Sequence, residues 1–263
     1  MKRDILDRLL DWKQKCNRKP LIIQGARQIG KTYSLLEFAE KNFPNYIYLN
    51  FEKQKELKEI FDHNLDPKVI IQKISISLEK PILKNDLIIF DEIQECPRAL
   101  TSLKYFCEQM PEQALISAGS LLGVKLNELS YPVGKVDHLE MYPMNFKEFL
   151  QALEKNILIE ALEAGLSKLE IYSELHSKLW ELLKVYFITG GLPEPILEYI
   201  KHQDQSIIAF QKVRDKQQDI ISDYLSDMAK HAGKENAVIC LHGYLFLVVT
   251  PPIFIFQGVK GLF

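Results

Sequence analysis

Eight consecutive residues near the start of the chain have the types and spacing needed to bind a phosphate group. They read GARQIGKT and match the pattern G-x-x-x-x-G-K-[ST] throughout. Glycines at the first and sixth positions allow positive φ, so that successive backbone N–H groups can point at one anion. Lys31 would then reach the β- and γ-phosphates of a nucleotide, and Thr32 would offer its hydroxyl to Mg²⁺. The candidate nucleotide-binding residues are Gly25, Ala26, Arg27, Gln28, Ile29, Gly30, Lys31 and Thr32.

Two adjacent carboxylates follow an apolar run further along the chain. The run Leu87–Phe90 reads LIIF, and Asp91 and Glu92 come directly after it. Ligands of open α/β sheets bind at the carboxyl ends of the strands. Asp91 suits a direct or a second-shell role toward Mg²⁺, and Glu92 suits the general base that orients an attacking water. A solvated turn is the alternative interpretation, but the complete loop upstream favours the catalytic one.

The next apolar run also leads to a polar residue. It covers Ala114–Ala118, and Ser120 follows it at a point where a side chain could contact the γ-phosphate. Ser117 is the nearby competitor, although strand alternation places it away from the tip. Ser120 could instead cap the following turn. The candidate catalytic residues are therefore Glu92, Lys31 and Ser120.

These side chains need a framework that brings the ends of several strands together. Up to about residue 142, β-branched runs alternate with helical patterns, which is typical of a parallel sheet covered on both faces. The expected strands are Leu21–Gln24, Tyr46–Phe51, Leu87–Phe90, Ala114–Ala118 and Val136–Met141, and the expected helices between them are Lys31–Asn42, Lys53–Asp62, Pro67–Leu78 and Pro97–Gln109. From Asn145 to about His231 the pattern is nearly all helical.

Bulk properties exclude several classes of protein. A length of 263 residues favours one large domain with a smaller one. The net charge of −2 gives no basic field, so nothing in the sequence points directly to nucleic acid. The four cysteines lack CxxC spacing, and charges interrupt every apolar run of the N-terminal segment. These features favour a cytoplasmic protein with reduced thiols, without a signal peptide or a structural zinc site.

With these features in place, the chain resembles a widespread group of bacterial and archaeal AAA+ ATPases. In that group a C-terminal domain of unknown function, with a restriction-nuclease-like fold, follows the ATPase. The matching segments occur in the group's order: GARQIGKTYSLLEF, YIYLNFE, LIIFDEIQECPRALTSLKYF, SAGSLLGV, PVGKVDHLEMYPMNFKEFL, GGLPEPI and ISDYLSDMAKH. The resemblance implies an α/β P-loop NTPase of the additional-strand type, with sheet order 5-1-4-3-2, followed by a helical lid. It also implies ATP and Mg²⁺ as ligands, Gly25–Thr32 as Walker A, Asp91 and Glu92 as Walker B, and Ser120 as sensor 1.

Other residues receive a role only through this resemblance. Gln94 lies in the group's DEIQ element and would position the water or the loop. Arg27 could touch phosphate or reach a neighbouring subunit. No arginine finger stands out: Arg98 and Arg214 are candidates, but a surface charge or ion pair explains each more simply. The glycine pair of GGLPEPI could serve as a hinge, although a helix C-cap is the better interpretation.

The last 29 residues depart from the resemblance. No charged residue occurs between Asn236 and Val259, against 26% in the whole chain. A membrane span, a buried terminal strand or hairpin, and a frame disruption would each produce such a tail. Pro251-Pro252 would interrupt a membrane helix, and the match ends abruptly, so we favour a frame disruption. The expected domains are the ATPase over 1–142, the lid over 143–234 and an atypical tail over 235–263.

The expected function is Mg-dependent ATP hydrolysis coupled to movement of the lid. One alternative is a nucleotide-binding interaction module, or an inactive truncated remnant, with little turnover. A second is a nucleic-acid-linked function that resides in the missing C-terminal domain. A homo-oligomer and an unidentified protein partner stay open, and membrane association is not expected.

Overall fold

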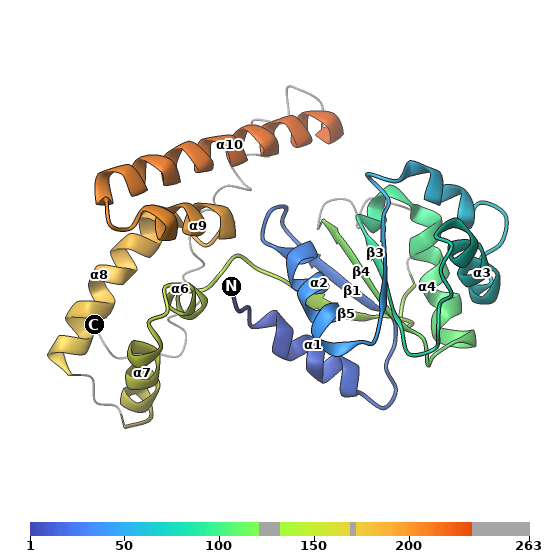
Figure 1. The fold of residues 1–263 in the computed structure, drawn as a ribbon, viewed down its shortest axis with the longest axis horizontal. Coiled ribbons are helices and arrows are strands. Elements are labelled where there is room, and N and C mark those ends of the chain that lie inside the picture. Colours follow the sequence, from blue (N-terminus) through green and yellow to red (C-terminus); the bar gives the residue numbers. More distant parts are fainter. Residues whose placement is uncertain (121–131, 169–171, 233–263) are drawn as a thin grey trace. The chain divides into compact units, whose positions relative to one another are not determined.

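The computed structural model describes residues 1–120, 132–168 and 172–232 of the chain. They form two compact units (Figure 1): one is Asp4–Met141, and the other joins Met1–Arg3 to the chain from Tyr142 onward. The atypical tail predicted over 235–263 lies outside the described residues, and so does the end of SAGSLLGV. In the described ranges no helix combines the length and the apolar character that a membrane span requires.

A five-stranded parallel sheet forms the centre of the first unit. Its strands are β1 Leu21–Gly25, β2 Tyr46–Asn50, β3 Leu87–Asp91, β4 Ala114–Ser120 and β5 Asp137–Glu140. They lie in the order β2-β3-β4-β1-β5, and every neighbouring pair is parallel. This is the predicted order 5-1-4-3-2 read from the other edge, so the predicted α/β P-loop NTPase fold is confirmed.

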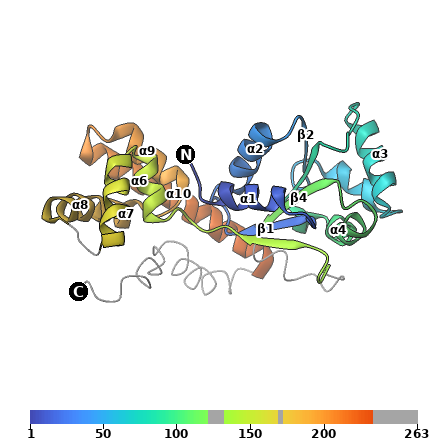
Figure 2. The same cartoon turned by 90° about the horizontal axis from the view of Figure 1, so that it is seen from below.

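Helices cover the sheet on both sides, with α1 and α2 on one side and α3 and α4 on the other (Figures 1 and 2). Their bounds are α1 Ile5–Gln14, α2 Lys31–Asn42, α3 Pro67–Ser77 and α4 Pro97–Gln109, with short 3₁₀ helices η1 Lys55–Phe61 and η2 Ile93–Glu95. The segment expected to be an ordinary helix over 53–62 is thus a 3₁₀ helix. Phe51, Phe61 and Phe90 meet there edge to face in a core that α3 and α4 complete.

The register of the sheet aligns the ends of the strands that carry the candidate residues. Gly25 pairs with Ser120 across β1 and β4. Asn50 pairs with Asp91 across β2 and β3. Because all the strands are parallel, these four residues lie along the same carboxyl edge.

The second unit is helical, as the sequence pattern predicts. Its helices are α6 Phe146–Ala152, α7 Asn156–Lys168, α8 Ser173–Thr189, α9 Pro193–His202 and α10 Ser206–Ala232. Phe149, Tyr186 and Ile196 are fully buried in its core. Gly190 ends α8 with φ 70° and donates its N–H to the Tyr186 carbonyl at 2.8 Å, so the predicted helix C-cap is confirmed.

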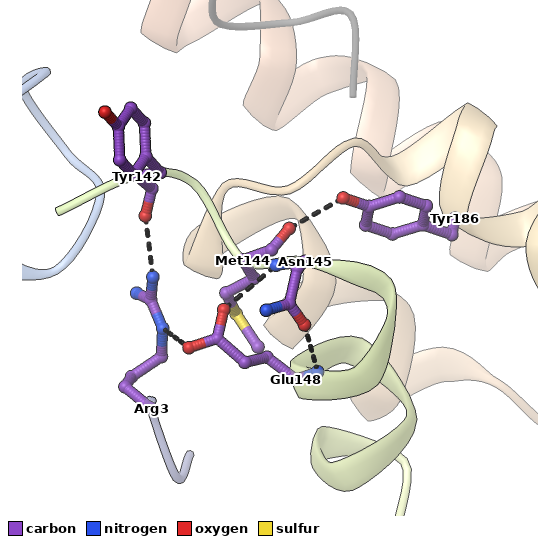
Figure 3. Close-up of polar contacts among 6 residues, drawn as sticks. All are labelled: Arg3, Tyr142, Met144, Asn145, Glu148 and Tyr186. Atoms are coloured by element: carbon purple, nitrogen blue, oxygen red, sulfur yellow. Dashed lines mark hydrogen bonds and ion pairs between the residues drawn. The ribbon is translucent and has the colours of Figure 1, made fainter. Parts of the chain in front are cut away.

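A buried polar cluster ties the first three residues into the helical unit (Figure 3). Arg3 Nε donates to Glu148 Oε1 at 2.9 Å, and Arg3 Nη2 donates to the Tyr142 carbonyl at 2.7 Å. Glu148 Oε2 also accepts the Asn145 N–H at 2.9 Å, which completes a capping box at the start of α6. The Arg3 and Glu148 side chains are 5% and 4% exposed, so this ion pair is a buried one.

Candidate functional site

The loop between β1 and α2 owes its shape to backbone conformations that only some residues tolerate. Gln28 and Gly30 have positive φ, at 61° and 92°, and Gly30 is the N-cap of α2. Positive φ expected at Gly25 is wrong, because that residue is the extended last residue of β1. Gly25 is required for a different reason: a Cβ there would overlap the Met141 carbonyl oxygen and the Ile29 side chain.

Lys31 is the first residue of α2, and its side chain folds back over the start of the loop. Its ammonium donates to the carbonyl oxygens of Gly25 at 3.0 Å and Ala26 at 2.6 Å. Burial lowers the pKa of Lys31 to about 8, and the carboxylates of Glu92 and Asp91 oppose that shift. The result is a buried cation at the amino end of a helix, which is a suitable environment for a phosphate anion.

Thr32 and Asp91, the two residues expected to serve a metal ion, are in direct contact. Thr32 Oγ1 donates to Asp91 Oδ2 at 2.8 Å, and the backbone N–H of Glu92 donates to Asp91 Oδ1 at 3.0 Å. Asp91 is only 1% exposed. A hydroxyl and a carboxylate are the hard oxygen donors that Mg²⁺ prefers.

Two further residues on β2 reach the same carboxylate, and neither belongs to a motif that the sequence alone identifies. Tyr48 OH donates to Asp91 Oδ2 at 2.7 Å. Asn50 Nδ2 lies 3.1 Å from Tyr48 OH and 3.4 Å from Asp91 Oδ2. Burial and the hydrogen bond to Asp91 raise the pKa of the Tyr48 phenol, and the hydrogen bond from Asn50 opposes this shift. The available signal was the pair of polar side chains spaced two apart in the strand YIYLN, which places them on one face.

Glu92 and Ser120 are connected through Gln94. Gln94 Nε2 donates to Glu92 Oε2, and Gln94 Oε1 accepts the backbone N–H of Ser120 at 3.3 Å. Burial raises the pKa of Glu92, and the hydrogen bond from Gln94 opposes this shift. Ser117, the competitor of Ser120, is fully buried and donates to the Leu21 carbonyl at 3.1 Å.

Each of the two candidate arginine fingers forms a hydrogen bond within its own compact unit. Arg98 Nε donates to the Phe61 carbonyl at 2.6 Å, which ties η1 to the start of α4. Arg214 lies on α10 and donates to Gln217 at 3.4 Å. Arg27 lies in the loop itself, between two buried residues, Ala26 and Ile29, that anchor the loop to the core.

The oxygen donors of Thr32 and Asp91 fit a magnesium ion that takes its other ligands from phosphate groups and water. Over the ranges that the structure describes, no three His, Cys, Asp or Glu side chains form a cluster that could hold a metal ion. Thr32 at the start of α2 and Asp91 at the end of β3 place two oxygen donors next to each other. Mg²⁺ is commonly bound by one or two protein oxygens together with substrate phosphates and water.

A family model described as an AAA domain matches residues 17–150, just over half of the chain. No curated protein matches the chain. The Walker-type ATPase PABY2304 of Pyrococcus abyssi is similar in structure, with a TM-score of 0.55 and 15% identity over 88% of this chain and 76% of that one. At this identity the likeness is one of fold.

Two further solved structures align less closely. The AMPPCP-bound DnaA of Aquifex aeolicus has a TM-score of 0.45 and 15% identity over 87% of this chain and 68% of its own. The Orc1 protein of Aeropyrum pernix, solved in complex with DNA, has a TM-score of 0.38 and 12% identity over 92% of this chain and 81% of its own.

Proposed function

The chain belongs to the AAA domain family, and from this premise we propose that it binds Mg·ATP at Gly25–Thr32 and hydrolyses it. The observation that carries the proposal is the hydrogen bond between Thr32 and Asp91. At the amino end of α2, it joins the candidate phosphate loop to the candidate Walker B strand. A glycine turn before an ordinary helix would not require a buried carboxylate at this point.

Binding would use the loop backbone, Lys31 and Thr32. The ammonium of Lys31, now held by two carbonyl oxygens of the motif, would donate hydrogen bonds to phosphate oxygens of the nucleotide. Because the Thr32 hydroxyl donates its hydrogen bond to Asp91, the lone pairs of the Thr32 oxygen are available to a metal ion. Mg²⁺ bound there would neutralise charge that develops on the phosphate oxygens.

Hydrolysis would use Glu92 and Ser120. Glu92 directly follows the carboxylate of Asp91, and its raised pKa makes it a stronger base than an exposed glutamate. Glu92 would orient the attacking water and accept its proton, while Ser120 at the tip of β4 would contact the γ-phosphate. Movement of the helical unit as a lid and assembly with a second copy of the chain extend the same proposal.

Thermal unfolding with and without millimolar Mg·ATP tests nucleotide binding. A ligand present at a hundred times its Kd stabilises the folded state by about 2.7 kcal/mol, which raises Tm by several degrees. We expect this rise in the wild type and its loss in Lys31→Ala, because the variant removes the buried cation of the loop. A wild-type Tm that does not respond to Mg·ATP would show that the proposed function is wrong.

Phosphate release from the same samples separates the alternatives. A protein whose Tm rises and which releases phosphate is an ATPase. A protein whose Tm rises without phosphate release is a nucleotide-binding module with little turnover, which is the second function that the sequence leaves open.

A further inference from the structure

Tyr48 and Asn50 form a chain of hydrogen bonds that ends on the buried carboxylate of Asp91. Both lie on β2, two residues apart and therefore on one face of the strand. The strand pairing Asn50↔Asp91 brings this face to the end of β3. Neither residue has a role in the proposed binding or hydrolysis of ATP.

The backbone determines which way the Asn50 amide points. Asn50 Oδ1 accepts the backbone N–H groups of Glu52 at 3.1 Å and Lys53 at 2.9 Å. Only the oxygen of the amide can accept a hydrogen bond, so its NH₂ group must face the other way. That group lies 3.1 Å from Tyr48 OH.

The orientation of Asn50 then determines the position of the Tyr48 proton. A phenol has one O–H proton and can also accept a hydrogen bond. Since Asn50 donates to the phenol oxygen, the phenol proton points to Asp91 Oδ2 at 2.7 Å. Asp91 Oδ2 accepts the Thr32 hydroxyl as well, and Oδ1 accepts a backbone N–H, so both carboxylate oxygens are fixed in position.

We infer that Tyr48, oriented by Asn50, is a positioning residue for the magnesium ion of the proposed ATP site. Tyr48 holds the Asp91 carboxylate in the position where it accepts the hydrogen bond of the Thr32 hydroxyl. The lone pairs of the Thr32 oxygen then stay available to the metal. The inference rests on the proposed function. Outer-shell partners of this kind change metal affinity by about 10-fold to 100-fold when they are removed.

The test measures how much Mg²⁺ tightens nucleotide binding. The Kd of a fluorescent ATP analogue, methylanthraniloyl-ATP, is determined for the full chain in EDTA and in saturating Mg²⁺. The Kd in EDTA divided by the Kd in Mg²⁺ gives the factor by which the metal tightens binding. We expect Tyr48→Phe to lower this ratio about ten-fold while the Kd in EDTA stays unchanged. A merely structural role would weaken binding equally in both conditions.

Tyr46→Phe is the matched control, because it also removes a tyrosine hydroxyl from the same face of β2. Tyr46 OH contacts the exposed Glu40 at 3.4 Å, so this variant should keep the wild-type ratio. Asn50→Asp is a second test: its carboxylate can still accept the two backbone N–H groups, but it competes with Asp91 for the Tyr48 proton. The ratio should fall in this variant too.

The outcomes are distinct. A wild type that does not bind the analogue overturns the proposed function and this inference with it. A wild type that binds, with Tyr48→Phe keeping the wild-type ratio or losing affinity equally in EDTA, overturns the inference alone. A ratio that falls in Tyr48→Phe and Asn50→Asp, but not in Tyr46→Phe, supports it.

Discussion

At the scale of single residues, burial shifts the two key titratable groups of the candidate site in opposite directions. It lowers the pKa of Lys31 to about 8 and raises the pKa of Glu92. Both shifts have the same cause, since burial disfavours the charged form of any side chain. Lys31 is still mostly protonated at neutral pH, because its pKa of about 8 lies above that pH. We therefore expect a bound phosphate to stabilise the Lys31 ammonium, whose charged form burial disfavours in the protein without nucleotide.

Glu92→Gln tests the assignment of the general base. Glutamine has nearly the shape of glutamate but cannot accept a proton from water at neutral pH. We expect nucleotide binding to be retained and kcat to fall by about two orders of magnitude or more. The measurements are the shift of Tm with Mg·ATP and the initial rate of phosphate release. Turnover at the wild-type rate in Glu92→Gln would mean that another group activates the water.

At the scale of elements, the end of β1 shows how closely the loop is fitted to its neighbours. A side chain at Gly25 would overlap the carbonyl oxygen of Met141, the residue that follows β5. Because this oxygen belongs to the backbone, it cannot move aside as the end of a flexible side chain could. The Met141 N–H in turn donates to the Gln24 carbonyl at 2.8 Å. The candidate loop therefore begins at a point that the neighbouring edge of the sheet holds in place.

Gly25→Ala should consequently destabilise the folded state even without nucleotide. Overpacking of this kind costs about 1–3 kcal/mol. The midpoint and slope of urea unfolding give the change in the free energy of unfolding. Gly134→Ala is an informative comparison: its Cβ would meet nothing within 4 Å, but its φ of 72° strains an alanine by about 1–2 kcal/mol. Wild-type stability of Gly25→Ala would contradict the close packing at this point.

At the scale of the whole molecule, the chain passes between the two compact units twice, after Arg3 and after Met141. The first crossing is anchored in the helical unit by the buried pair of Arg3 and Glu148 (Figure 3). A buried carboxylate without its cation is costly, because the interior solvates charge poorly. The first three residues thus support a unit whose other residues begin 139 positions later at Tyr142.

Arg3→Met should weaken the helical unit specifically. Removal of one partner from a buried ion pair costs about 3–5 kcal/mol, so amides of α6 and α8 should exchange about 100-fold faster or more. Hydrogen exchange read by mass spectrometry measures this, with the amides of β1 and β3 as the internal reference. The double variant Arg3→Met/Glu148→Gln should regain part of the protection, because glutamine keeps the capping box but carries no charge. Equal acceleration in the sheet would contradict a local role for Arg3.

The sequence by itself indicated the fold class and the positions of most elements, and the family resemblance of its motifs implied the strand order. The apolar runs of β1, β3 and β4 are each bounded by glycine, charge or proline, and the helical spacing between them is typical of a parallel sheet covered by helices. It also identified the stretch Gly25–Thr32 and the pair Asp91 and Glu92, because these motifs are contiguous in the chain. Their catalytic roles remain predictions.

Only the tertiary structure decided which distant side chains meet these motifs. Tyr48 and Asn50 reach Asp91 because β2 and β3 are neighbours in register, and Arg3 reaches Glu148 across 145 positions of the chain. It also showed that Gly25 is needed for space rather than for positive φ, since the limiting atom belongs to Met141. The physical reason is the same in each case: local patterns determine local conformation, whereas contacts between distant residues depend on how the elements pack.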